Sequence, residues 1–145
     1  MILNLLLALT LQNASPPPAP DWSTECLSQV GGLAGSQPQL DNRRWTREAR
    51  RRADEMWAMQ YQALQLIEGS NREADALWRR ETAGEVPAGA AEAQAADIDR
   101  QLVQIMSQFS EMISATPACG LRVPVLTIDG RREERAVRQA ALGAE

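Results

Sequence analysis

The residues best suited to chemistry are six arginines between positions 43 and 52, namely Arg43, Arg44, Arg47, Arg50, Arg51 and Arg52. All but Arg52 project away from the apolar side of the helix expected there, so the other five form a concentrated cationic patch. Arg43 and Arg44 also fall in the first helical turn, where the helix dipole disfavours cations. The patch is therefore a candidate for binding an acidic protein or an anionic envelope surface.

A plainer interpretation of the same arginines is a solvated surface. Acidic residues near the patch in the expected fold can balance its charge: Glu48, Asp54, Glu55 and Glu111. Mixed charges along a helix usually face water without binding a ligand. The sequence leaves both interpretations open.

The chain has no histidine, and this excludes several kinds of catalytic site. Without imidazole there is no Ser/His or Cys/His nucleophile pair, no ordinary zinc site and no histidine pH switch. Five acidic residues lack the alternating oxygen ligands of a calcium loop and are expected on the solvated surface: Glu81, Glu85, Glu92, Asp97 and Asp99. We expect no enzyme, catalytic residue, cofactor or metal; a carboxylate-based enzyme is the alternative of another class.

The formal net charge is −4. Because nucleic-acid binding depends on neutralising phosphates, this balance argues against a nucleic-acid partner. A length of 145 residues and an apolar content of 44% indicate one folded domain with a buried core.

Two apolar stripes with helical spacing predict the helices that position the arginine patch and the acidic residues. The first consists of Trp45, Ala49, Ala53, Met56, Gln60, Ala63, Ile67, Ala74, Leu77 and Trp78. The second steps by four and three residues, the spacing of a coiled-coil seam: Ala91, Ala95, Ile98, Leu102, Ile105, Phe109 and Met112. We predict an all-α fold built on a long antiparallel helical hairpin, whose first helix continues through Gly69, Ser70 and Asn71.

A short helix is expected before the hairpin. Asp21 is the expected N-cap, and Gly31 and Gly32 the expected end. A connector follows, and either Asp41 or Asn42 then caps the first long helix.

The chain after the hairpin has a different pattern. Residues 121–128 are rich in β-branched side chains, but Pro124 and the lack of a second strand signal favour an extended strap. A turn at Asp129 and Gly130 leads to a weak terminal helix over residues 131–142. Its modest apolar side contains Ala136, Val137, Ala140 and Ala141.

The N-terminal residues favour export. Residues 2–11 are an apolar run long enough for the core of a signal peptide and too short to span a bilayer, and residues 1–14 are the expected signal peptide. Residues 15–20 form a proline-rich linker, and residues 21–145 a single helical domain. We expect a periplasmic or secreted protein without a transmembrane span; the alternative is a buried first helix of a cytosolic protein.

Cys26 and Cys119 are the only cysteines. In an antiparallel hairpin they are attached where the second helix returns beside the start of the first, so we predict a disulfide between them. Such a bond fits an oxidising compartment. The alternative is a pair of unlinked buried thiols.

Trp57 and Leu64 flank the first stripe and, with Trp78 of the stripe itself, form a candidate apolar surface for a protein partner or a second copy. The expected function is therefore a non-enzymatic, exported helical protein that binds a protein partner or self-assembles in the cell envelope. A periplasmic chaperone-like or stress-sensing protein is the alternative.

Overall fold

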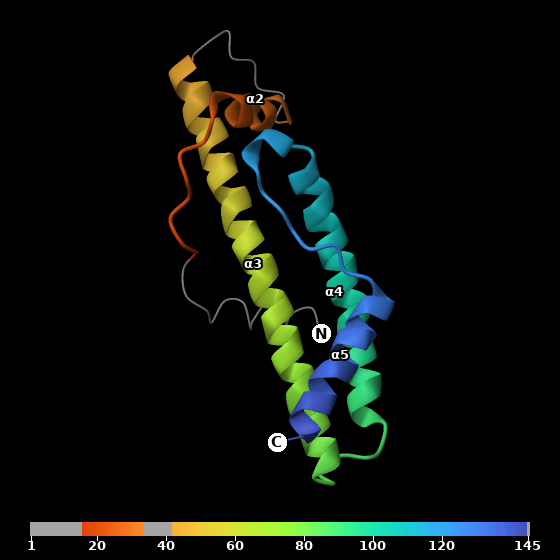
Figure 1. The fold of residues 1–145 in the computed structure, drawn as a ribbon. Helices are drawn as coiled ribbons and strands as arrows, with labels where there is room; N and C mark the ends of the chain where they lie inside the picture. The colour runs from red at the N-terminus through yellow and green to blue at the C-terminus, as the bar shows by residue number, and fades with distance from the viewer. Residues whose placement is uncertain (1–15, 34–41, 145) are drawn as a thin grey trace. The chain divides into compact units, whose positions relative to one another are not determined.

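The computed structural model describes residues 16–33 and 42–144, and every regular element in these ranges is a helix. The elements are α2 (Thr24–Leu33), α3 (Asn42–Thr82), α4 (Ala90–Ser114), the 3-10 helix η1 (Pro117–Cys119) and α5 (Ile128–Gly143). Figure 1 shows the long helices α3 and α4 as successive arms of a hairpin, so the predicted all-α hairpin is confirmed. None of these described helices is both long enough and apolar enough to cross a membrane.

Some predictions fall on parts of the chain that the structure does not describe. These are the signal peptide at residues 1–14, the connector at residues 34–40, and the capping side chains of Asp41 and Asn42.

The chain divides into two compact units. The α2 unit contains, among the described residues, 16–33, 42–63 and 108–124. The α5 unit contains residues 64–107 and 125–144. Helices α3 and α4 each contribute to both units, and the expectation of a single domain stays a prediction.

Helix α3 continues without interruption through Gly69, Ser70 and Asn71, as predicted. Ser70 is fully buried, and its hydroxyl donates to the backbone carbonyl of Leu66 at 2.7 Å. This bond satisfies the hydroxyl within the helix, so the serine does not have to begin a new helix to find a partner.

The inward side of α4 shifts along its length. The first four residues of the predicted seam are buried: Ala91, Ala95, Ile98 and Leu102. Farther along, Met106 and Ile113 are buried, whereas Met112 is 46% exposed. A coiled-coil seam assumes 3.5 residues per turn, but a straight helix has 3.6, so the inward side drifts by about 20° per heptad. The predicted stripe is therefore wrong at Met112.

The core of the α2 unit brings together α2, the first half of α3, the end of α4 and the chain that follows it. Its buried side chains are Cys26, Leu27, Val30, Ala49, Ala53, Met56, Ile113, Cys119 and Leu121. The predicted disulfide is present here and joins Cys26 of α2 to Cys119 of η1. It ties α2 to the chain that leaves the hairpin.

Helix α2 differs from the prediction at both ends. Its N-cap is Ser23, whose hydroxyl accepts a hydrogen bond from the backbone N–H of Cys26 at 3.0 Å, so Asp21 is not the cap. The helix also continues past Gly31. A Cβ at Gly31 would lie 2.5 Å from the indole nitrogen of Trp45, so this glycine allows a close contact between helices and does not end one.

The predicted strap is present between η1 and α5. Residues 121–127 lie outside every helix, and the described chain contains no strand with which they could pair. Leu121 is buried in the α2-unit core, and the N–H of Arg122 donates to Oε1 of Gln60 at 2.7 Å. The strap ends one residue earlier than predicted, because Ile128 begins α5.

Helix α5 begins at the position predicted to be a turn. The hydroxyl of Thr127 accepts a hydrogen bond from the N–H of Gly130 at 3.0 Å, so Thr127 is the N-cap. Asp129 and Gly130 therefore lie in the first helical turn, where an acidic side chain is favourable.

The inward side of α5 is the reverse of the prediction. Its buried residues are Arg131 and Arg135. The side chains expected to face inward are exposed: Ala136, Val137, Ala140 and Ala141. The prediction was wrong because it considered only apolar residues, whereas α5 packs through charged groups that have partners on α4 and α3.

Candidate functional site

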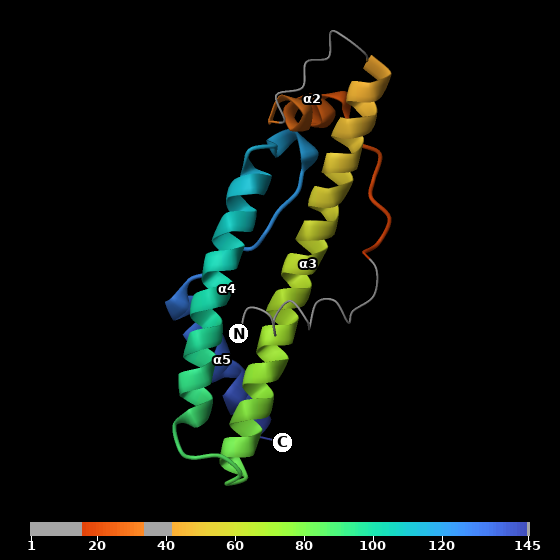
Figure 2. The same ribbon diagram turned by 180° about the vertical axis from the view of Figure 1, so that it is seen from behind.

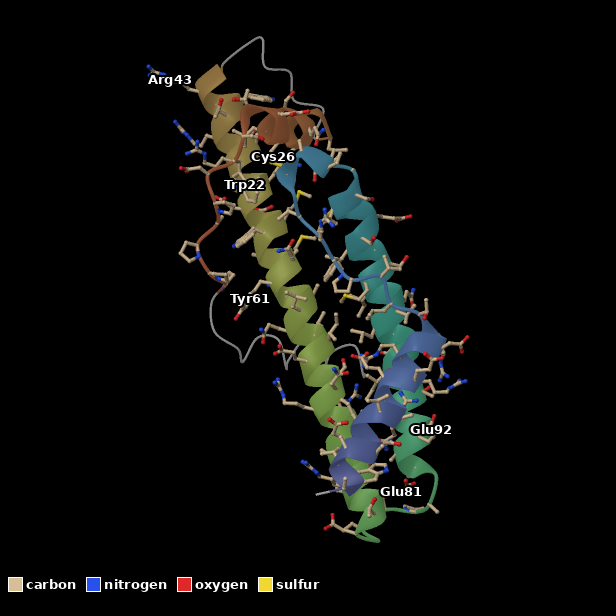
Figure 3. All side chains as sticks on the ribbon, viewed as in Figure 1. Trp22, Cys26, Arg43, Tyr61, Glu81 and Glu92 are labelled. Atoms are coloured by element: carbon tan, nitrogen blue, oxygen red, sulfur yellow. A yellow bond between two sulfur atoms is a disulfide. The ribbon has the colours of Figure 1, made fainter. Side chains whose placement is uncertain are left out.

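The N-terminal half of α3 presents an arginine face, made of Arg43, Thr46, Arg47 and Arg50. These residues recur at intervals of three and four, so they share one side of the helix. They line an open depression of about 480 Å³ in the α2 unit. Figure 3 labels Arg43 at the start of α3, with its side chain directed away from the helix.

Two of the acidic residues expected to balance the patch interact with groups other than Arg47 and Arg50. Asp54 accepts a hydrogen bond from the indole N–H of Trp22 at 2.8 Å. Glu55 forms an ion pair with Arg51 one turn before it. Within the described chain, no acidic side chain pairs with Arg47 or Arg50.

The remaining arginines of the predicted patch have different surroundings. Arg43 and Arg44 have interactions of their own, and Arg51 is paired with Glu55. The cationic surface accessible to a ligand therefore depends chiefly on Arg47 and Arg50, both of which are exposed.

The arginine side chains of this site have the chemistry that suits an anion. A guanidinium group presents several N–H donors in a planar fork and can bind a carboxylate or a phosphate through two parallel hydrogen bonds. Among the described residues that line the depression there is no carboxylate to move a proton, and the sequence has no histidine. The described chain also contains no group of three or more residues suited to binding a metal ion.

The predicted apolar surface is distributed over both units. Trp57 belongs to the α2 unit, packs against its core and donates its indole N–H to the carbonyl of Pro17 at 2.8 Å. Leu64 and Trp78 belong to the α5 unit. Leu64 is 44% exposed, and Trp78 is half-buried. The chain's own proline-rich segment thus lies against Trp57.

A second charged cluster lies in the α5 unit and was not predicted from the sequence. Nε of Arg131 donates to Oδ1 of Asp99 at 3.2 Å, and Arg135 donates to the other oxygen of the same carboxylate. Arg135 also pairs with Glu92 at 3.0 Å. The side chains of Arg131, Arg135 and Asp99 are each 4% exposed or less, so the expectation that Asp99 is solvated was wrong.

Electrostatics keep the buried guanidinium of Arg135 charged. Burial alone lowers the pKa of the Arg135 guanidinium, but its hydrogen bonds and charge interactions with Asp99 and Glu92 outweigh burial and raise the pKa above its ordinary value. A third arginine, Arg138, pairs with Asp75 of α3 at 3.0 Å. Arg131, Arg135, Asp99 and Glu92 bind one another, and together with the Arg138–Asp75 pair they hold α5 in place.

The sequence did contain a signal for this cluster. Arg131, Arg135 and Arg138 recur on one side of α5, and Glu92 and Asp99 are separated by seven residues on one side of α4. Opposite charges at helical spacing on two different helices indicate pairing only when the helices are known to be neighbours.

Comparison with known proteins gives no relative for this chain: no protein-family model, no curated protein and no solved structure matches it.

Proposed function

We propose that this protein is an exported, non-enzymatic binding protein whose arginine face recognises an acidic segment of a protein partner. One observation supports the proposal above the others. Arg47 and Arg50 line an open depression, while two of the carboxylates expected to neutralise them interact with Trp22 and Arg51. Within the described chain, neither of these carboxylates pairs with Arg47 or Arg50, so both guanidinium groups are available to an acidic ligand.

The scaffold suits this role. The arginine face lies on a long helix that packs against the disulfide-tied core of the α2 unit, so its guanidinium groups project from a rigid support. Binding then requires ordering of arginine side chains but not of the backbone, which lowers the entropic cost of association. The disulfide pair supports export to an oxidising compartment.

A titration with a defined acidic peptide tests the proposal. A fluorescent peptide of alternating glutamate and serine is titrated with the wild-type protein and with the double variant Arg47→Glu/Arg50→Glu. Charge-assisted hydrogen bonds contribute about 1.5 to 3 kcal/mol each, so the variant is expected to bind at least about tenfold more weakly. Wild-type binding should also weaken as salt is added.

The matched control is Arg72→Glu/Arg79→Glu, which makes the same change in charge on exposed residues of the same helix in the α5 unit. Its affinity should stay within about twofold of wild type. Equal weakening by both double variants would show that only net charge matters and would refute a specific face. Preferential binding to anionic phospholipid vesicles instead of the peptide would replace the protein partner with a membrane surface.

A further inference from the structure

The proline-rich segment before α2 lies along α3 in the α2 unit. Figures 1 and 2 show residues 16–22 running beside the first half of α3 from both viewing directions. The indole N–H of Trp57 donates to the carbonyl of Pro17 at 2.8 Å, and that of Trp22 donates to Asp54 at 2.8 Å. We call residues 16–20 the proline strap.

The tryptophan that binds the proline strap, Trp57, is one of a pair with Trp22. The rings of Trp22 and Trp57 are 6.2 Å apart and meet edge to face at 69°. Both rings also pack against the core of the α2 unit. Trp22 is fixed further by its bond to Asp54 and by its position four residues before the disulfide-bonded Cys26. The aromatic pair is therefore a rigid part of the fold.

This arrangement has the chemistry of proline-rich peptide recognition. A polyproline II segment has no internal hydrogen bonds, so its carbonyls are free to accept bonds from a protein. Aromatic rings pack against the proline side chains, and little entropy is lost because the segment is already extended. Trp57 supplies both an indole donor for a carbonyl and an aromatic ring beside it.

The proline strap is mostly exposed to solvent. Pro16, Pro17, Pro18 and Pro20 are all exposed, and only Ala19 is half-buried. Since hydrophobic stabilisation scales with the apolar area removed from water, these prolines contribute little to the stability of the fold. Trp22 and α2 remain anchored when the strap moves, because the Cys26–Cys119 disulfide lies beyond it.

We propose that the Trp22/Trp57 pair is a binding site for a proline-rich segment of a partner protein, and that the chain's own proline strap occupies this site in the absence of the partner. Because the proline strap binds Trp57, the site is suited to ligands of the same kind, namely proline-rich peptides. Tyr61 lies one turn beyond Trp57, and Figure 3 shows its side chain on the side of α3 along which the strap runs, where it extends the aromatic surface. This proposal is independent of the arginine face and uses a different ligand.

The first step of the test is to release the strap in the full chain. The variant Pro16→Gly/Pro17→Gly/Pro18→Gly removes the preference for polyproline II structure and keeps every residue of the site. A synthetic peptide with the sequence Ser-Pro-Pro-Pro-Ala-Pro-Asp is then titrated into ¹⁵N-labelled wild-type and variant proteins. The signals followed are the indole N–H groups of Trp57, identified by its loss in Trp57→Phe, and of Trp22, which lies beside it and reports binding in the variants that lack Trp57.

The released variant should bind the peptide at least about tenfold more tightly than wild type. In the wild type the proline strap occupies the site for most of the time, and the apparent affinity falls in proportion to the fraction of molecules whose site is free. Adding Trp57→Phe to the released variant keeps an aromatic ring but removes the donor, and should abolish most of this gain. A peptide with alanine in place of each proline should not bind. The exposed-loop substitution Pro87→Gly, in the α5 unit, should leave peptide affinity at the wild-type value.

Three outcomes would overturn the proposal. One is a released variant that stays folded and shows no change at Trp57 on addition of the peptide, which would make the strap purely structural. Another is peptide binding that Trp57→Phe leaves intact. The third is a wild-type dimer in sedimentation that the glycine substitutions dissociate, which would identify the occupant as the strap of a second copy.

Discussion

Arg131 of α5 and Asp99 of α4 form an ion pair with Nε and Oδ1 3.2 Å apart, and neither side chain is more than 4% exposed. Arg135 binds the other oxygen of the same carboxylate. A single aspartate thus bridges two buried guanidinium groups, and Glu92 and Glu134 supply further negative charge. Removal of one partner from a buried ion pair is costly because the remaining charge stays away from water.

Replacement of Asp99 should therefore destabilise the protein severely. Asp99→Asn keeps the shape of the side chain but leaves Arg131 and Arg135 without their shared anion, and the free energy of unfolding should fall by about 3 to 5 kcal/mol. Urea denaturation followed by circular dichroism measures the change. Asp97→Asn, which alters an exposed pair with Arg100 on the same helix, should cost about 0.5 kcal/mol or less. Similar losses in both variants would contradict the importance of burial.

Gly31 and Gly32 make a second matched pair. Gly31→Ala places a methyl group 2.5 Å from the Trp45 indole nitrogen, whereas a Cβ at Gly32 has no neighbour within 4 Å. The first substitution should destabilise the α2 unit by about 1 to 3 kcal/mol through overpacking. The second should stabilise α2 by up to about 1 kcal/mol, because alanine favours a helix over glycine. Thermal unfolding of both variants should show shifts of opposite sign.

Glu73 should make stability depend on pH. Burial raises the pKa of its carboxyl above the ordinary value of 4.5, and in the described chain no group hydrogen-bonds to its buried Oε2. The folded state then binds the proton more tightly than the unfolded state does. The contribution of Glu73 to stability is present below the ordinary pKa and is lost as the pH rises through the raised one.

Glu73→Gln should consequently stabilise the protein at neutral pH and make little difference below pH 4.5. Urea midpoints measured from about pH 4 to about pH 7 would reveal this divergence. The exposed residue Glu68, on the same helix, provides the control variant Glu68→Gln, which removes the same charge at a site without burial. A constant offset for Glu73→Gln across this pH range would mean that its effect comes from packing and not from titration.

The disulfide should be detectable by mass and by stability. Protein treated with iodoacetamide should gain two carbamidomethyl groups only after reduction, because Cys26 and Cys119 are bonded to each other. The bond closes a loop with a sequence separation of 93 residues. In the chain-entropy model, its loss in Cys26→Ser/Cys119→Ser lowers the free energy of unfolding by about 4 to 5 kcal/mol. Alkylation without reductant in protein from the native host would contradict both the bond and the export that it supports.

The amino-acid sequence by itself determined the helical hairpin, its continuous first helix and the pairing of the two cysteines. These features follow from information carried by neighbouring residues, namely apolar spacing of three and four and a loop rich in glycine and proline. Pairing of Cys26 with Cys119 then follows from connectivity, since an antiparallel hairpin returns the chain to its starting end.

The tertiary structure alone decided which side of α5 faces inward and what lies against Trp57. Apolar periodicity predicted an inward side containing Val137, which is 70% exposed. Arg131 is buried in its place because Asp99 lies on the neighbouring helix. Burial of a charge is costly unless it has a partner, and the partner of Arg131 is 32 residues away in the sequence. The bond from Trp57 to Pro17 likewise joins residues 40 positions apart. Local spacing cannot specify such contacts, because they exist only after the chain has brought distant segments together.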